Sequence, residues 1–274
     1  MAKPKQSSDA GEISILEVFQ GTFDVYILGV SPFIYNAMSE KARHELLMPA
    51  PRKNAAERAA NLKHNPIEEY RNSAYVNLDP KAATKLNFPS AGFKKALSSA
   101  ALDIPGAAKA QIGRLVWTEG DRVDFYGVPK LMCSITRSAD MNHTPDVRTR
   151  AILPEWACRL SIRFKRPILK EQTVANLLAA AGLTQGVGDW RQQKGSGSYG
   201  QFKLVSTDDP DFVRVRKAGG RDAQIAALEK PEFYDDETEK LMLWFDEELK
   251  RRGGAPRNGS SKKIEVEQEE EMAD

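Results

Sequence analysis

Gly182–Phe202, GLTQGVGDWRQQKGSGSYGQF, holds six of the nineteen glycines in the chain. Because glycine gives up side-chain packing and costs backbone entropy, so dense a cluster indicates positive-φ backbone or the close approach of another segment. Apolar, strand-forming residues follow, which predicts a core strand over 200–205. Two interpretations stay open. One is a glycine-rich hairpin with a structural role only; the other is a loop whose N–H groups, with Arg191 and Lys194, bind phosphates.

The loop matches neither of two common phosphate-binding patterns. It lacks the Gly-Lys-Ser/Thr of a P-loop. It also differs from a dinucleotide-binding fingerprint, because the strand comes after the glycines and no helix does.

Composition describes an ordinary globular body with polar ends. The chain has 274 residues, of which 41% are hydrophobic and 28% charged, and its net charge is +2. A glutamate-rich end, 265–274, offsets a more basic body, which is compatible with a polyanionic partner. Residues 1–20 are predicted to form a disordered arm, and residues 253–274 a disordered acidic tail.

The sequence predicts neither a metal nor a cofactor. Cys133 and Cys158 form no CxxC pair, which indicates reduced, buried thiols in a cytosolic protein. His44, His64 and His143 lack the spacing of metal ligands. No apolar run has the length of a signal peptide or a membrane span. We therefore expect a soluble protein of the cytoplasm with no membrane partner.

Hydrophobic periodicity predicts alternating strands and helices. Strands are expected over 22–30, 112–117, 123–128, 130–135 and 156–164, the last with Trp156, Cys158, Leu160, Ile162 and Phe164 on one face. Ser31-Pro32 is expected to be a turn or the start of a short helix over 34–47, with Ser39 capping 40–47. Further helices are expected after Ser90 and over 171–181, the latter ending at Gly182. After residue 210 we expect one or two polar helices with an apolar stripe of Leu241, Leu243, Trp244 and Leu249.

Three basic segments stand out from this pattern. Lys94 and Lys95 come near the start of the helix after Ser90, where lysine opposes the helix dipole, so stability does not explain them. The polar segment 49–66 is expected to be an exposed excursion with a helical flap over 54–62. Residues 136–150 carry three arginines and show no periodicity, which predicts a protruding loop between two strands.

Three blocks of sequence resemble the RAMP superfamily, in particular the backbone subunits of CRISPR effector complexes and related uncharacterised phage and prophage proteins. They are Gly29-Val30-Ser31-Pro32 after the first strand, the helix entry Phe88–Leu97, and the loop and strand over Gly186–Phe202. The resemblance covers about residues 22–205. It implies an α+β fold with an RRM-like (ferredoxin-like) antiparallel sheet, two helices on one face, and insertions that form a palm, a thumb hairpin and a finger-like flap, in a protein of a bacterial host cell.

The implied domain organisation has four parts. A disordered arm over 1–20 precedes an RRM-like domain over 21–206, with insertions at about 49–66 (flap) and 134–151 (thumb). A helical extension over 207–252 and the acidic tail over 253–274 follow. The extension and tail depart from the CRISPR subunits, and this departure puts assembly into a CRISPR complex in doubt.

The resemblance implies a single-stranded nucleic-acid-binding protein that coats RNA or DNA as a helical, head-to-tail assembly. Lysine, arginine and backbone N–H groups track phosphates without reading sequence, and a thumb side chain can stack on bases. The expected partners are a single strand, further copies of the chain, and other effector or phage recombination subunits. The expected binding residues are Lys94, Lys95, Arg137, Met141, His143, Arg148, Arg150, Gly188, Arg191, Lys194, Gly195 and Gly197.

Two other functions stay open. Some relatives cut RNA with a loop aspartate or a histidine, and Asp140 and His143 lie close together in the presumed thumb, so a metal-independent endoribonuclease is one alternative. A structural or interaction protein that binds no nucleic acid is the other. The prediction adopted here is a protein without enzymatic activity.

Overall fold

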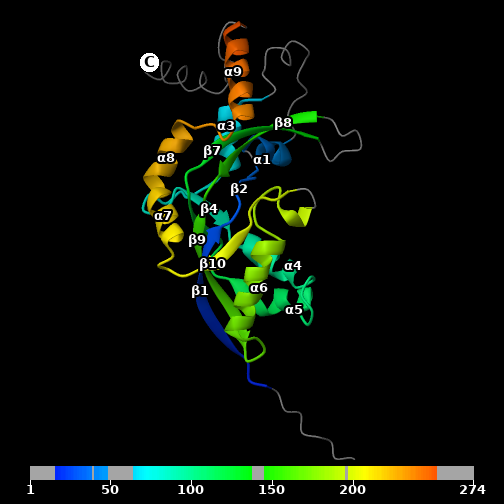
Figure 1. Ribbon diagram of the computed structural model, residues 1–274. Coiled ribbons are helices and arrows are strands. Elements are labelled where there is room, and N and C mark those ends of the chain that lie inside the picture. Colours follow the sequence, from blue (N-terminus) through cyan, green and yellow to red (C-terminus); the bar gives the residue numbers. More distant parts are fainter. Residues whose placement is uncertain (1–15, 39, 49–63, 138–144, 195–196, 252–274) are drawn as a thin grey trace, which may run out of the picture.

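The computed structural model describes residues 16–38, 40–48, 64–137, 145–194 and 197–251 (Figure 1). The predicted flap, the acidic tail and the cap at Ser39 lie outside the described residues. So does most of the predicted arm, although the first strand already begins at Phe19, inside it.

The central sheet has ferredoxin-like topology. Its strands are β1 (Phe19–Gly29), β5 (Val116–Thr118), β6 (Arg122–Tyr126), β9 (Ala157–Arg166) and β10 (Phe202–Val205), extended by β3 (Tyr75–Val76) and β4 (Leu86–Pro89). The spatial order is β10-β1-β9-β6-β4-β3, β5 also pairs with β9, and each pairing is antiparallel. Helix α4 (Ala91–Ala100) lies between β1 and β5 in the chain, and α6 (Glu171–Thr184) lies between β9 and β10. This is the βαββαβ arrangement, so the predicted α+β fold class is confirmed.

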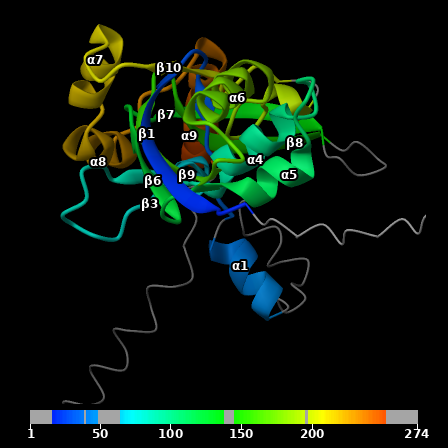
Figure 2. The same cartoon turned by 90° about the horizontal axis from the view of Figure 1, so that it is seen from below.

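The core lies between this sheet and the helices α4 and α6. On β9 the side chains of Cys158, Leu160, Ile162 and Phe164 are buried, as the alternation predicts. The α6 residues expected to face inward are buried as well: Val174, Leu177, Leu178 and Ala181. Figure 2 shows α4, α5 (Lys109–Leu115) and α6 on one side of the sheet. Helices α7 (Pro210–Ala218) and α8 (Arg221–Glu229) lie on the other side.

A smaller sheet carries the segment predicted as the thumb. Strands β7 (Lys130–Arg137) and β8 (Pro145–Leu153) form a long antiparallel hairpin, and β2 (Phe33–Ile34) pairs with β8. Helices α3 (Pro66–Ser73) and α9 (Asp236–Arg251) contact the hairpin. The expectation of a loop over 136–150 is therefore wrong over most of its length, because the strands pair along it without an alternating apolar pattern.

Several local predictions need correction. Residues 112–115 belong to helix α5 and not to a strand, because a short apolar run does not distinguish the two periods and packing on α4 decides. Gly182 does not end α6, which continues to Thr184; a Cβ on Gly182 would lie 2.1 Å from the Phe202 carbonyl oxygen. The glycine is there to let β10 pass close to the helix.

Residues 210–251, the described part of the C-terminal region, form three helices, α7, α8 and α9, where one or two were expected. On α9 the buried apolar residue is Met242, whereas Leu243 and Trp244 are 55% and 62% exposed. Helix α1 (Glu40–Leu47) matches its prediction, but Phe33–Ile34 is a strand. Both cysteines are free and buried. Among the described residues no helix has the length and apolar character needed to cross a membrane.

Candidate nucleic-acid interface

The glycine-rich loop is built by close backbone contacts. Gly186, Gly188 and Gly200 have φ values of +65°, +89° and +73°. A Cβ on Gly200 would lie 1.7 Å from the Val187 carbonyl oxygen, and one on Gly197 would lie 1.5 Å from the Trp190 carbonyl oxygen. Glycine is thus required here by backbone shape and by the approach of the two halves of the loop.

The N–H groups of the loop are largely used inside the protein. The N–H of Val187 donates to the Gly200 carbonyl at 2.9 Å, and that of Gly200 donates to the Pro32 carbonyl at 2.8 Å. The N–H of Asp189 donates to the Ile34 carbonyl at 3.0 Å. These bonds fix the loop between β2 and β10 but leave those groups unavailable to a phosphate. Phosphate binding at this loop therefore depends on its side chains.

Three arginines lie on the two segments that meet at the contact of Arg150 with Asp189, and we call them the arginine cluster: Arg148 and Arg150 on β8, and Arg191 in the loop. Arg148 and Arg150 alternate along β8 and so lie on the same face of the hairpin. Arg150 Nη2 lies 3.5 Å from Asp189 Oδ2, and its Nη1 donates to Asn36 Oδ1. Arg191 Nη1 donates to the Gly188 carbonyl at 3.0 Å. The cluster thus joins the hairpin to the loop.

The cluster carries more positive than negative charge. Its three guanidinium groups have one carboxylate in direct contact, that of Asp189. Burial lowers the pKa of Arg150, whose side chain is 12% exposed, while Asp189 raises it. Arg148 has no ion pair within the described parts of the chain. A polyanion placed here would meet fixed donors that already have their orientation.

Two aromatic residues adjoin the cluster. The rings of Trp190 and Tyr199 lie 6.1 Å apart at 49°, and both pack on the buried residues Ile34, Met132 and Ile152. Trp190 has a φ of +47°, a conformation that non-glycine residues seldom adopt and that often marks functional sites. Neither residue is among the binding groups predicted from the sequence. The available signal was the presence of aromatic residues within a glycine-rich, basic loop.

The remaining predicted residues lie near the loop, elsewhere in the fold, or outside the described parts of the chain. Lys95 is exposed on α4 one turn before Ser99, whose Oγ accepts a bond from Gln193 Nε2 at 3.1 Å, so α4 adjoins the 3-10 turn η1 (Gln192–Lys194). Lys94 lies instead beside Trp117, away from the cluster. Arg137 ends β7. The predicted residues outside the described parts are Asp140, Met141, His143 and Gly195.

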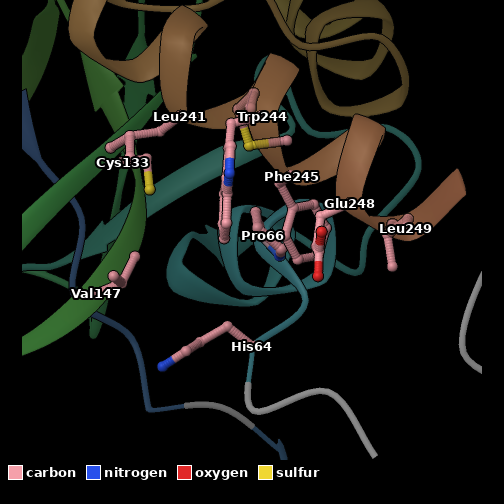
Figure 3. A pocket seen from close by; sticks show the side chains of 10 residues that line it. His64, Pro66, Cys133, Val147, Leu241, Trp244, Phe245, Glu248 and Leu249 are labelled. Atoms are coloured by element: carbon pink, nitrogen blue, oxygen red, sulfur yellow. The ribbon is translucent and has the colours of Figure 1, made fainter. Parts of the chain in front are cut away.

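A second surface feature is an apolar groove of about 280 Å³ between α9, the β7–β8 hairpin and the start of α3 (Figure 3). Trp244 and Phe245 project from α9 on one side, with Pro66 and Val147 opposite. At its edge His64 Nδ1 lies 2.9 Å from Glu69 Oε1, and Nε2 lies 3.3 Å from Asp146 Oδ1 without hydrogen-bond geometry. The groove suits an apolar partner and not a polyanion.

The described ranges contain no group of three or more His, Cys, Asp or Glu residues arranged to hold a metal ion. No family model matches the chain, and no curated protein matches it. Among solved structures, a chain of the cryo-EM structure of the Type III-B Cmr-beta complex bound to cognate target RNA is similar, with 14% identity and a TM-score of 0.37. The match covers 68% of this chain and 59% of that one. At this level it is a distant likeness of fold.

Proposed function

We propose that this protein binds single-stranded nucleic acid with little sequence preference, at the arginine cluster and the adjoining rings of Trp190 and Tyr199. The observation that carries the proposal is that Arg150, which shares a face of β8 with Arg148, contacts Asp189 of the loop that also carries Arg191, so that three guanidinium groups on adjoining segments have one contacting carboxylate. Guanidinium groups bind phosphates bidentately, and aromatic rings stack on any base. Such a site would bind a nucleic-acid strand without recognising its base sequence.

The proposal predicts strong dependence on salt. Each phosphate contact to a single strand contributes about −0.7 to the slope of log K against log salt concentration, so replacing all three arginines by alanine should flatten the slope by about 2. Anisotropy of a labelled homopolymeric strand measures this. A matched control replaces three exposed cations on the α7–α8 side, namely Arg216, Lys217 and Lys230. If both triple variants change binding equally, the arginine cluster is not the site.

The nature of the strand is an outcome of the first measurement. The purified protein is examined by its 260/280 nm absorbance ratio, and any bound polymer is digested with RNase and with DNase. Sensitivity to RNase alone favours a guide-RNA role of the kind that the resemblance to CRISPR backbone subunits implies. Sensitivity to DNase alone favours single-stranded DNA binding in phage replication or recombination. Protein free of polymer that also fails to shift single strands at low salt contradicts the proposal.

We further propose that copies assemble head to tail along the strand, through the apolar groove of one copy and the end of α1 of the next. Leu46, Leu47 and Met48 are 75%, 80% and 77% exposed, an apolar run that a lone soluble chain does not require. A protruding patch and a groove on one chain make a heterologous contact, which repeats without closing unless the rotation forms a ring. Each copy bound to the strand would then offer its own apolar groove to the end of α1 of the next copy.

Mixing two variants tests this assembly. Leu47→Asp and Trp244→Asp each remove one side of the contact, so each alone should sediment as a monomer on a short strand. An equal mixture retains one intact contact per pair and should form dimers but no longer species. If wild-type protein is monomeric on a long strand, or if the mixture forms no dimer, the contact is refuted.

The proposed activity is binding without cleavage. Incubation of the wild type with labelled RNA, with and without a chelator, should leave the strand intact. If cleavage occurs, His143→Ala and Asp140→Ala decide whether these residues carry it, and loss of cleavage with retained binding would replace this part of the proposal by an endoribonuclease.

A further inference from the structure

The outward face of β9 carries polar side chains along its open half. Arg159, Ser161, Arg163 and Lys165 alternate with the buried residues of the strand. Near the end of β9 that precedes Arg159, Phe212 and Val215 of α7 cover this face by packing on Ala157 and Leu28. The half of the sheet from Arg159 to Lys165 is therefore the part that α7 leaves accessible.

Trp117 lies at the edge of this open half. It pairs with Arg163 across β5 and β9, so its indole shares the outward face with Arg163 and Lys165. The ammonium of Lys165 lies 5.2 Å from the centre of the indole ring, and that of Lys94, which reaches over from α4, lies 5.3 Å from it. Two elements distant in the sequence thus place a cation against one ring.

These two lysines differ from Arg159 and Arg163 of β9 in having no carboxylate partner among the described residues. Arg159 pairs with Asp24 at 2.6 Å, and Arg163 pairs with Glu119. Within the described residues, Lys94 and Lys165 have no ion pair. Of these four cations, Lys94 and Lys165 are the two without a contacting carboxylate, and both lie at the indole. The ring attracts each ammonium, but the two like charges repel each other and Lys94 also opposes the dipole of α4.

The same face has room for a strand to continue. A polar hollow of about 490 Å³ adjoins the pair of Arg163 and Glu119, and its charged lining consists of two arginines, Arg122 and Arg159, and two carboxylates, Glu119 and Asp124. Arg122 packs over the ring of Tyr75 at 4.8 Å. Cations interleaved with aromatic rings along an open surface are the usual means of binding a single strand without sequence preference.

We propose that Trp117, Lys94 and Lys165 form a second nucleotide-binding site, in which the ammonium groups hold a phosphate and the indole stacks on a base. We call it the Trp117 site. The inference rests on the proposed function, since it supplies a further contact for the same strand. It places that contact on the sheet, apart from the arginine cluster of the loop and hairpin.

The test uses the full-length chain and a labelled homopolymeric strand. Trp117→Ala should weaken binding about tenfold, as for loss of one stacked base, whereas Trp117→Phe should restore most of it. Lys94→Ala with Lys165→Ala should flatten the salt slope by about 0.7, because the two ammonium groups hold one phosphate. The matched control is Lys217→Ala with Lys230→Ala, which should leave the slope unchanged. In a Trp190→Phe background, the strand should quench a fluorescence component that Trp117→Phe abolishes.

The outcomes separate the two proposals. If the lysine variant, shown by circular dichroism to be folded, binds with wild-type affinity and slope while the arginine-cluster variant does not, the Trp117 site is refuted and the proposed function stands. If the wild type binds no strand, both fail. If the strand quenches the fluorescence of Trp117, and if the salt slope is reduced in the lysine variant, the Trp117 site is supported. This result does not require Trp117→Ala to fold.

Discussion

The arginine cluster and the Trp117 site present cations in two different ways. At the cluster, Arg150 is almost buried, contacts Asp189 and Asn36, and is held in one orientation. At the Trp117 site, two lysines rest on a ring with no acceptor, so their ammonium groups can move to a ligand. The first arrangement is preorganised and specific in geometry; the second is adaptable. Substitutions at the arginine cluster and at the Trp117 site should therefore affect strand binding in different ways.

The largest effect is expected from the glycines that shape the loop under the cluster. Gly200→Ala would combine a φ of +73° with a Cβ 1.7 Å from the Val187 carbonyl oxygen, and should cost about 3 kcal/mol or more of unfolding free energy. Gly106→Ala is the matched control, with a φ of +84° but nothing within 4 Å, and should cost about 1 kcal/mol. Urea unfolding measures both. Equal losses of unfolding free energy in the two variants would mean that the loop changes its conformation to make room for the added Cβ.

An exchange of arginine and lysine tests the contrast directly. Arg150→Lys should weaken strand binding about tenfold, because an ammonium cannot keep both the Asn36 and the Asp189 contacts while presenting a fork to phosphate. Lys165→Arg should change the affinity by less than about threefold, since the Trp117 site needs charge over the ring and not a fixed fork. Anisotropy with the same strand decides, and a reversed order would remove the distinction between the two sites.

The two sites also differ in how much of them the sequence predicts. Strand β9 is predictable because its alternation of period two persists over the whole strand, and Val174, Leu177, Leu178 and Ala181 of α6 follow from helical spacing for the same reason. At the arginine cluster, the sequence predicts Arg148, Arg150 and Arg191 as strand-binding residues. It does not predict that β8 and the loop adjoin, because this depends on the pairing of β8 with β2 and on the packing of the loop there. These are contacts between segments far apart in the chain.

The Trp117 site escaped prediction for a related reason. In the sequence, Trp117 is an ordinary residue of a predicted strand. It lies beside Lys165 because the register of β5 against β9 pairs it with Arg163. Lys94 was singled out because it opposes a helix dipole, but the sequence does not state that its side chain reaches a ring on β5. The outer part of the hairpin is not predicted from periodicity, because Arg148, Thr149 and Arg150 put polar side chains on both faces of β8 in succession; only the resemblance implies a thumb hairpin there.

The smallest effect concerns Asp24, whose pairing keeps Arg159 from adding to the charge of the Trp117 site. A hydrogen bond from Ser161 and then the contact with Arg159 lower the pKa of Asp24. A carboxyl whose pKa is lower in the folded state contributes stability above its unfolded pKa of about 3.9, and that stability is lost as the pH falls through the folded value. Because the pair is partly solvent-exposed, Asp24→Asn should cost under about 0.5 kcal/mol at neutral pH and nothing in acid.

The same substitution should act on binding in the opposite direction. With Asp24 neutral, Arg159 has no carboxylate partner, and the open half of the sheet gains one unit of positive charge. Strand binding should tighten by about twofold at low salt, with a slope steeper by up to about 0.7. Asp246→Asn, at an exposed position on α9, is the control for the change in net charge alone. If both variants tighten binding equally, the gain is a long-range effect of total charge. If Asp24→Asn alone does so, the strand passes over the outward face of β9, as the Trp117 site requires.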